Sequence, residues 1–369
     1  MIPVNEPLLN GNEKKYLNEC VDTGWISSEG PFVKKFEDDF SAISNRAYGI
    51  SVCNGTAALE IAVEALGITK GDEVILPSFT IISCVSAIIK AGATPVLVDS
   101  EELTWNMNVS QIEAKITNKT KAIMLVHIYG LTVDVDPVLE LATRYNLKVI
   151  EDAAEAHGQT YKGKPCGSFG DVSVFSFYPN KLITTGEGGM ILTNDSIIAE
   201  RLRSLRNLCF TSKRFIHQDL GWNMRMTNLQ AAIGVAQLER WQESINRKRE
   251  IGKLYTELLI SESGLTLPVI KTSYCDNIYW VYGVILKDMN ISAETIMKQL
   301  ADEEIGTRPF FYPMHLQPVL KNRGLFKNEK YPIAEKLYKQ GFYLPCGLAI
   351  TNKQIVIVAE TLKRILKNG

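Results

Sequence analysis

The sequence lacks the features that mark secreted, metal-binding and membrane proteins. Its seven cysteines stand singly, without a CxxC pair, so neither a disulfide framework nor a cysteine-based metal site is expected. No apolar run approaches the length of a membrane span. The first residues contain no basic segment followed by an apolar one, so no secretory signal is expected either. Together these absences predict a cytoplasmic protein.

An excess of charge of one sign is also missing. The chain has 40 Lys and Arg against 41 Asp and Glu, a formal net charge of -1. A protein without a broad basic field is a poor partner for nucleic acid or for an anionic membrane surface, and neither is expected here. The remaining composition, 46% hydrophobic and 22% charged over 369 residues, is that of a globular protein with one large domain and a smaller companion.

The first half of the chain alternates short apolar runs with helical patterns. Between Ser51 and Asn194 the runs PVLVD, KAIMLV, KVIED and VSVFSF predict strands, and GTAALEIAVEAL, ISCVSAIIKAG, VSQIEAKI and DPVLELATRYN predict helices. Continuous apolar runs are typical of strands that are buried on both faces. The alternation therefore predicts an α/β fold with a mostly parallel sheet flanked by helices.

The second half has a different pattern. Residues 197–206 and 227–259 have helical spacing, with Thr227 as the expected N-cap of the longer segment. A strand-like run (IYWVYGVIL), a helix (AETIMKQLADEE) and a Pro/Tyr/His loop (TRPFFYPMH) follow, which indicates a smaller α+β domain. We place the boundary inside the long helix and predict a large domain over 1–245 and a small domain over 246–369.

Two motifs lie where predicted strands end, which is where ligands bind in such sheets. In SVCNGTAAL, a turn of small residues leads into a helix, so that the N–H groups of Gly55, Thr56 and Ala57 could bind an anion. An ordinary capped helix has the same pattern. In VIED, Asp152 could hold a proton on a heteroaromatic nitrogen, although an acidic strand end can equally cap the next helix.

Two further motifs contain a lysine and an asparagine. FSFYPNKLITTGEGG places Lys181 just past a strand, where desolvation would make its amine nucleophilic, and Ser176 near enough to bind a phosphate. Most loop lysines lie at the surface, but this context of strand end, proline and glycines favours a function. GWNMRMT places Asn223 before a helix, where it could also be only a loop residue. An anion cradle, a carboxylate and a lysine together suit pyridoxal 5′-phosphate (PLP).

The motifs GTAAL, VIEDAAEAHG, FSFYPNK with TTGEGG, and GWNMRMTNLQAAIGVAQL resemble those of the DegT/DnrJ/EryC1/StrS family of sugar aminotransferases. The resemblance covers nearly the whole chain, including WISSEGPFVKKFEDDF, TRPFFYPMH and LPCG. It implies the PLP-dependent transferase fold type I, which is aspartate aminotransferase-like, and a homodimer with shared active sites. Family members that remove a sugar hydroxyl have His where this chain has Lys181, so transamination is favoured over dehydration.

The resemblance also assigns roles to residues. Lys181 would carry PLP as a Schiff base and move protons, and Asp152 would bind the ring nitrogen. Glu155 stands where many relatives have Gln or His near the ring hydroxyl. Ile81 stands where relatives place an aromatic residue on the ring. The phosphate would be held by Thr56, Ala57 and Ser176, next to Gly55, and by Asn223 from the neighbouring subunit.

The expected reaction is a ping-pong transfer of an amino group from L-glutamate to carbon 4 of a nucleotide-linked 4-keto-6-deoxyhexose. Resemblance in the 294–315 region favours GDP-4-keto-6-deoxy-D-mannose, with a dTDP- or UDP-linked 4-keto sugar or a 3-keto sugar as alternatives. Arg308, Tyr312 and His315 could contact the sugar or its diphosphate, or they could have a purely structural role. The same two alternatives apply to His127, near the predicted site. A non-catalytic regulatory relative is a further alternative, against which Lys181, Asp152 and the cradle argue.

Overall fold

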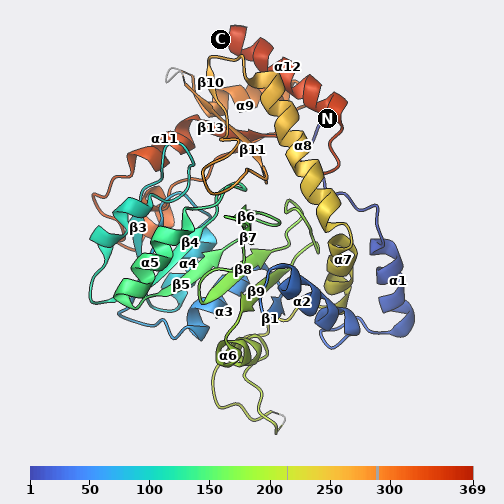
Figure 1. Ribbon diagram of the computed structural model, residues 1–369, viewed down its shortest axis with the longest axis vertical. Helices are drawn as coiled ribbons and strands as arrows, with labels where there is room; N and C mark the ends of the chain where they lie inside the picture. Colours follow the sequence, from blue (N-terminus) through green and yellow to red (C-terminus); the bar gives the residue numbers. More distant parts are fainter. Residues whose placement is uncertain (214, 288–290, 369) are drawn as a thin grey trace.

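A seven-stranded sheet forms the centre of the larger half of the molecule (Figure 1). The computed structural model describes residues 1–213, 215–287 and 291–368. The sheet has the order β1-β9-β8-β5-β4-β2-β3. Neighbours from β8 to β3 are parallel, whereas β9 is antiparallel to both β1 and β8, so the predicted mostly parallel mixed sheet is confirmed. Its strands are β1 (Tyr48–Val52), β2 (Glu73–Pro77), β3 (Thr94–Val98), β4 (Thr120–Val126), β5 (Lys148–Asp152), β8 (Val172–Ser176) and β9 (Gly189–Thr193).

Helices cover both faces of this sheet because alternate strand residues are apolar on each face. On one face, α3 (Gly55–Ala65), α4 (Ile82–Lys90) and α6 (Ser196–Arg206) share a core with Ile50, Leu76 and Val174. On the other face, α5 (Val135–Tyr145) packs against residues such as Ile123. There, α2 (Pro31–Ile43) and α7 (Asn228–Leu238) pack beside Phe175. Strands β6 (Thr160–Tyr161) and β7 (Lys164–Pro165) form a separate small hairpin.

A second, antiparallel sheet forms the smaller half. Its order is β10-β11-β13-β12, with β10 (Leu265–Thr266), β11 (Tyr282–Leu286), β12 (Arg308–Pro309) and β13 (Gly341–Leu344). The helices after α7 are α8 (Trp241–Leu259), α9 (Ala293–Asp302), α10 (Pro318–Asn322), α11 (Pro332–Gln340) and α12 (Asn352–Asn368). In Figure 1, α8 runs from the large half up to this sheet. The predicted boundary at 245/246 falls inside α8 and stays a prediction.

The N-terminal residues lie against the C-terminal half before the chain enters α1 (Glu13–Thr23). Ile2 pairs with Ile305, and the carbonyl of Val4 accepts the N–H of Cys346. The chain therefore begins in the smaller half and crosses to the larger one, which the sequence did not predict.

Two predicted helices differ from the structure. Residues 109–116 form two 3₁₀ turns, η1 (Val109–Gln111) and η2 (Glu113–Lys115), because the Asn108 side chain takes the N–H of Ser110. The segment 227–259 is broken between α7 and α8, where the N–H of Arg240 bonds to the carbonyl of Gln237. Thr227 caps α7 as predicted, in a capping box with Gln230. Among the described residues, no helix is both long and apolar enough to cross a membrane.

Candidate active site

A cavity of about 1300 Å³ opens where the parallel strands end. Its walls include Val126, Asp152 and Ser176, the last residues of β4, β5 and β8. The first turns of α3 and α4 form one side, and residues from the smaller half, such as Trp280 and Tyr343, form another. Parallel strands with their helices leave such a crevice at their carboxyl ends, and the cavity lies at the edge of the sheet where the sequence predicts a site.

Lys181 enters this cavity from the loop after β8. The Lys181 N–H bonds to the carbonyl of Tyr178, which closes a tight turn, and Nζ lies 3.9 Å from the centre of the Trp280 ring. In the described part of the chain, Nζ has no hydrogen-bond or ion-pair partner. Burial lowers the pKa of this amine, an effect that Glu155 and Asp152 oppose. A partly desolvated amine over an aromatic face is suited to attack a carbonyl carbon.

Asp152 is 2% exposed at the end of β5. Its Oδ1 accepts the N–H of Ala154 at 3.1 Å, and its Oδ2 accepts the Cys84 thiol at 3.2 Å. Burial raises the pKa of this carboxyl group. A buried carboxylate without a cationic side chain bonded to it is a strong acceptor for a charged N–H group in the cavity.

Glu155 lies on the turn that follows β5 and is also buried. Its Oε2 accepts the N–H of Tyr129 at 2.9 Å. Burial raises the pKa of Glu155 to about 7, while the positive charge of Lys181 opposes this change. The charges of Lys181 and Glu155 therefore influence each other in the cavity, although no hydrogen bond or ion pair joins the two side chains among the described residues.

The first turn of α3 offers two of the three N–H groups that the sequence predicts for an anion cradle. In the described residues, the N–H groups of Gly55 and Thr56 have no partner, but the N–H of Ala57 donates to Oδ1 of Asn54 at 2.8 Å. The structure thus supplies two free N–H groups and not three. A Cβ on Gly55 would lie 2.7 Å from the Cβ of Ser176, so only glycine brings this turn close to Ser176.

Ile81, Arg308 and Tyr312 also line the cavity. Ile81 is the N-cap of α4 and is 42% exposed, so its side chain is free to cover a ligand face. Arg308, on the edge strand β12, is exposed, and no ion pair to its guanidinium occurs among the described residues. The ring of Tyr312 packs edge-on against that of Tyr338, with centres 4.6 Å apart.

Two predicted residues lie elsewhere. His315 is 1% exposed and does not line the cavity; its ring bonds to Ser78 Oγ at 2.9 Å and Glu335 Oε1 at 3.2 Å. This favours the structural reading of His315. Asn223 is exposed, pairs through its backbone with Asn207, and lies outside the cavity of its own chain.

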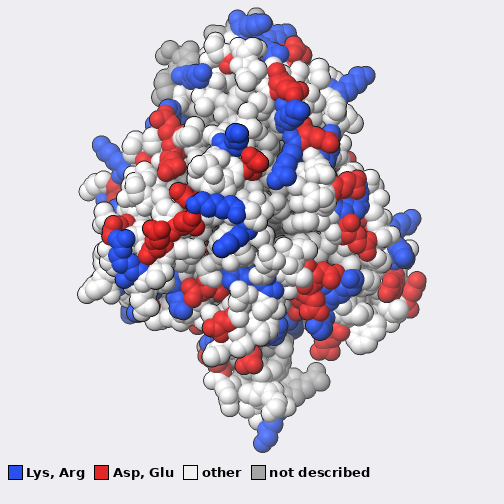
Figure 2. All heavy atoms as spheres, viewed as in Figure 1, with Lys and Arg blue, Asp and Glu red and all other residues white. Residues whose placement is uncertain are grey.

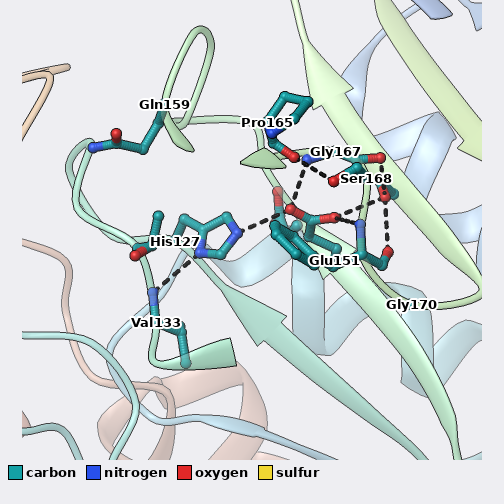
Figure 3. A network of polar contacts seen from close by, with 12 residues as sticks. His127, Val133, Glu151, Gln159, Pro165, Gly167, Ser168 and Gly170 are labelled. Atoms are coloured by element: carbon teal, nitrogen blue, oxygen red, sulfur yellow. Dashed lines mark hydrogen bonds and ion pairs between the residues drawn. The ribbon is translucent and has the colours of Figure 1, made fainter. Parts of the chain in front are cut away.

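His127 belongs to a buried network behind β5 (Figure 3). Its Nδ1 accepts the Val133 N–H, so Nε2 carries the proton and donates to Glu151 Oε1 at 3.0 Å. Glu151 also accepts the N–H groups of Gly167 and Phe169. His127, Glu151 and Cys166 are close enough to share a metal ion, but the hydrogen bonds already satisfy His127 and Glu151. The network orders the strand end that carries Asp152, which favours the structural reading of His127.

His157 lies in an aromatic cluster and not in an open loop. Its ring packs against those of Phe40, Phe175, Phe177 and Trp241, and neither nitrogen has a hydrogen-bond partner in the described residues. Burial lowers the pKa of His157 to about 3. The unfolded chain, with an ordinary histidine pKa, binds a proton between about pH 6.5 and 3 that the folded protein excludes, so stability falls as the pH falls through this window.

We therefore expect His157→Phe to reduce the acid sensitivity of the fold. Relative to the unchanged protein, the variant should lose about 2 kcal/mol less unfolding free energy between pH 7 and pH 5. Urea unfolding at both pH values measures this difference. The unchanged protein is the reference at both pH values. Equal pH dependence in the variant and in the unchanged protein would contradict the assignment.

Several residues that line the cavity or lie just behind its wall carried no sequence signal. Trp280 stands in a strand-like run that reads as core, yet its Nε1 donates to the carbonyl of Asn180 at 2.8 Å and so fixes the Lys181 loop. Cys84 and Asn54 form part of an ordinary helix start in the sequence. Trp280 and Cys84 act through contacts with residues that are distant in the sequence, and Asn54 acts as a helix cap. No local sequence pattern reveals these roles.

The cavity fits PLP. Its free amine, buried carboxylate and two unpaired N–H groups beside Ser176 match the aldehyde, ring nitrogen and phosphate of that cofactor. No protein group in the described residues occupies the amine or those two N–H groups, which leaves them available to a ligand.

Comparisons with known proteins agree with this fit. The profile of the DegT/DnrJ/EryC1/StrS aminotransferase family matches residues 7–363. A GDP-perosamine synthase from Escherichia coli O157:H7 is 46% identical over 98% of this chain and 97% of its own, and one from Vibrio cholerae is 41% identical over 98% of each. A Streptococcus pneumoniae structure in its PLP form superposes with a TM-score of 0.92, at 26% identity, over 100% of this chain and 99% of that one.

Proposed function

This chain belongs to the DegT/DnrJ/EryC1/StrS aminotransferase family of PLP-dependent enzymes, and we propose that it makes a 4-amino sugar from a GDP-linked 4-keto-6-deoxyhexose. The observation that carries the proposal is the unpaired Lys181 amine, which shares one cavity with the buried carboxylates of Asp152 and Glu155. Two relatives more than 40% identical over nearly the full length are GDP-perosamine synthases, which supports GDP-perosamine as the product.

We assign each cofactor contact to a residue of the cavity. PLP supplies a carbonyl carbon that exchanges amino groups and a ring that accepts electrons. Lys181 would hold the carbonyl carbon, and Asp152 would hold the proton of the ring nitrogen. Gly55, Thr56 and Ser176 would bind the phosphate, with Ala57 contributing the wall behind them, and Ile81 would cover one face of the ring.

Proton transfer falls to Lys181 and Glu155. With a pKa below its ordinary value, the Lys181 amine can take a proton from the substrate carbon and return it to the neighbouring position. Glu155, whose pKa is raised to about 7, can hold that proton in the meantime, which a glutamine at the same position could not do. The Trp280 ring beside the Lys181 amine would shield this exchange from water on one side.

The cavity is large enough to hold a cofactor and a sugar together. We assign the diphosphate of the sugar nucleotide to Arg308, since an unpaired guanidinium at the cavity wall is suited to a bidentate phosphate contact. Tyr312 would lie beside the sugar ring. L-glutamate, as the amino donor, would use the same cavity first and leave as 2-oxoglutarate, in a ping-pong sequence.

A substrate panel tests this function. The purified protein is incubated with PLP, L-glutamate and the GDP-, dTDP- and UDP-linked 4-keto-6-deoxyhexoses, together with 3-keto isomers, and products are identified by mass and NMR. We expect GDP-4-keto-6-deoxy-D-mannose to give GDP-perosamine with the highest kcat/KM. Faster turnover of a dTDP- or UDP-linked sugar, or of a 3-ketone, would contradict the substrate assignment.

We also propose a homodimer whose partner subunit completes each site. The segment 207–213 and 215–222, which we call the arm, projects below α6 (Figure 1). Figure 2 shows mostly uncharged atoms on the described part of this protrusion, with a basic side chain at its tip. Phe210, Ile216 and Leu220 are exposed on it, Leu220 by 88%. No arm residue lines the cavity of its own chain. Exposed apolar side chains on a projection favour burial against a second copy, which would bring Asn223 toward the partner's phosphate site.

We expect Leu220→Asp to convert the dimer into a monomer, because it would place a charge in an apolar interface. Sedimentation equilibrium measures the mass, and turnover should fall with it. Ile260→Asp is the control: Ile260 is 70% exposed and lies past the end of α8, far from the arm. A dimer that is retained by Leu220→Asp at micromolar concentration would contradict the role of the arm.

A further inference from the structure

We propose that Cys84 is a positioning residue whose thiol fixes the Asp152 carboxylate in the orientation that meets the cofactor ring. This inference rests on the proposed function, because it concerns how Asp152 is held for its partner. Cys84 is fully buried in the first turn of α4, and its Sγ lies 3.2 Å from Oδ2 of Asp152. The Thr80 hydroxyl lies 3.3 Å from the same sulfur.

Among the described residues, the Cys84 thiol is the one side chain that bonds to the Asp152 carboxylate. In the described residues, the carboxylate accepts two hydrogen bonds, from the Ala154 N–H and from Cys84, and no Arg, Lys or His side chain bonds to it. Burial and the nearby Asp152 raise the pKa of the Cys84 thiol well above its ordinary value, so the sulfur keeps its proton and donates it. The Thr80 hydroxyl can donate to the sulfur in turn, which gives a chain from Thr80 through Cys84 to Asp152.

A weak donor suits this position. An ammonium or guanidinium group would neutralise Asp152 and compete with the ring nitrogen, whereas a thiol orients the carboxylate and leaves most of its charge. The same turn also lines the cavity through Ile81 and Ser83. Residues 80–84 therefore hold both the side chain over the ring face and the partner of the ring-nitrogen carboxylate, so a shift of the turn would move both.

The test compares Cys84→Ala with Cys84→Ser, which are nearly equal in volume and differ in the donor. Both leave the same void, so a role in packing alone would affect them equally. We expect the dissociation constant for PLP to rise about tenfold in Cys84→Ala and to stay within about threefold of the unchanged protein in Cys84→Ser. Cys20→Ala, at a buried cysteine of α1 that neither lines the cavity nor bonds to Asp152, should leave affinity unchanged.

The absorbance of bound PLP provides a readout that packing does not move. A carboxylate that is no longer oriented stabilises the protonated ring nitrogen less well. Because less positive charge then remains on the ring, the nitrogen that links the lysine to the cofactor would hold its own proton more tightly. The pH midpoint of the visible band should rise by about half a unit in Cys84→Ala, whereas Cys84→Ser should have the same midpoint as the unchanged protein. If Cys84→Ala does not fold, the isosteric pair Cys84→Val and Cys84→Thr gives the same comparison.

Equal midpoints and affinities in the two members of a pair would overturn the role of Cys84. This result is distinct from failure of the proposed function, in which the unchanged protein itself would take up no PLP and show no visible band.

Discussion

Replacement of Lys181 by alanine should abolish turnover, with kcat reduced by at least about a thousandfold. The variant loses both the amine that holds the carbonyl carbon and the base that moves the proton. Neither of the two other described lysines near the site is free to take over. Lys248 donates to the carbonyls of Trp280 and Cys346, and Lys90, at the cavity wall, is paired with Glu60. Single-turnover formation of 2-oxoglutarate measures the loss, and the visible absorbance of lysine-bound PLP should vanish with it.

Lys70→Ala serves as the control for this experiment, since Lys70 is exposed and lies outside the cavity. It should keep full turnover and the same absorbance. Lys181→Ala protein that retained a tenth of the original rate would show that another group performs the chemistry.

Replacement of Asp152 by asparagine should lower kcat by a factor of about a hundred to a thousand. The amide keeps the shape of the side chain but removes the charge that holds a proton on the ring nitrogen, so the ring accepts electrons less well. PLP should also dissociate more readily. Measurements of kcat and of the PLP dissociation constant separate the two effects, because saturating PLP restores binding but not the rate.

Asp195→Asn is the matched control for this change of acid to amide. Asp195 is the N-cap of α6, where asparagine caps as well as aspartate, so stability and turnover should be unchanged. Full activity of Asp152→Asn at saturating PLP would contradict the role assigned to this carboxylate.

The sequence predicted the positions that follow from chain periodicity and strand ends. Asp152, Ser176 and Lys181 come together because β5 and β8 are parallel neighbours, so their carboxyl ends meet at one edge of the sheet. The turn before α3 joins them there for a different reason. It follows β1, which reaches the same edge although it pairs with the antiparallel strand β9. Alternation of strands and helices is a local signal, and it was enough to place these groups.

Contacts across the fold could not be predicted in this way. Trp280 meets the Lys181 loop across 100 positions, and Cys84 meets Asp152 across 68. The sequence also could not show which group would accept the N–H of Ala57. We expected a phosphate to accept it, but the Asn54 side chain does so in the structure. His315 stands in a loop that resembles a substrate site, but the packing of Ser78 and Glu335 around it is a tertiary property.

Identification of the lysine that binds PLP tests the central claim most directly. Borohydride reduction of the PLP-loaded protein fixes the cofactor to the lysine that holds it, and peptide mass spectrometry then locates the modified residue. We predict modification of Lys181 alone, complete at one cofactor per chain. Modification of Lys248 or of any other lysine in place of Lys181, or a protein that remains unmodified, would contradict the account.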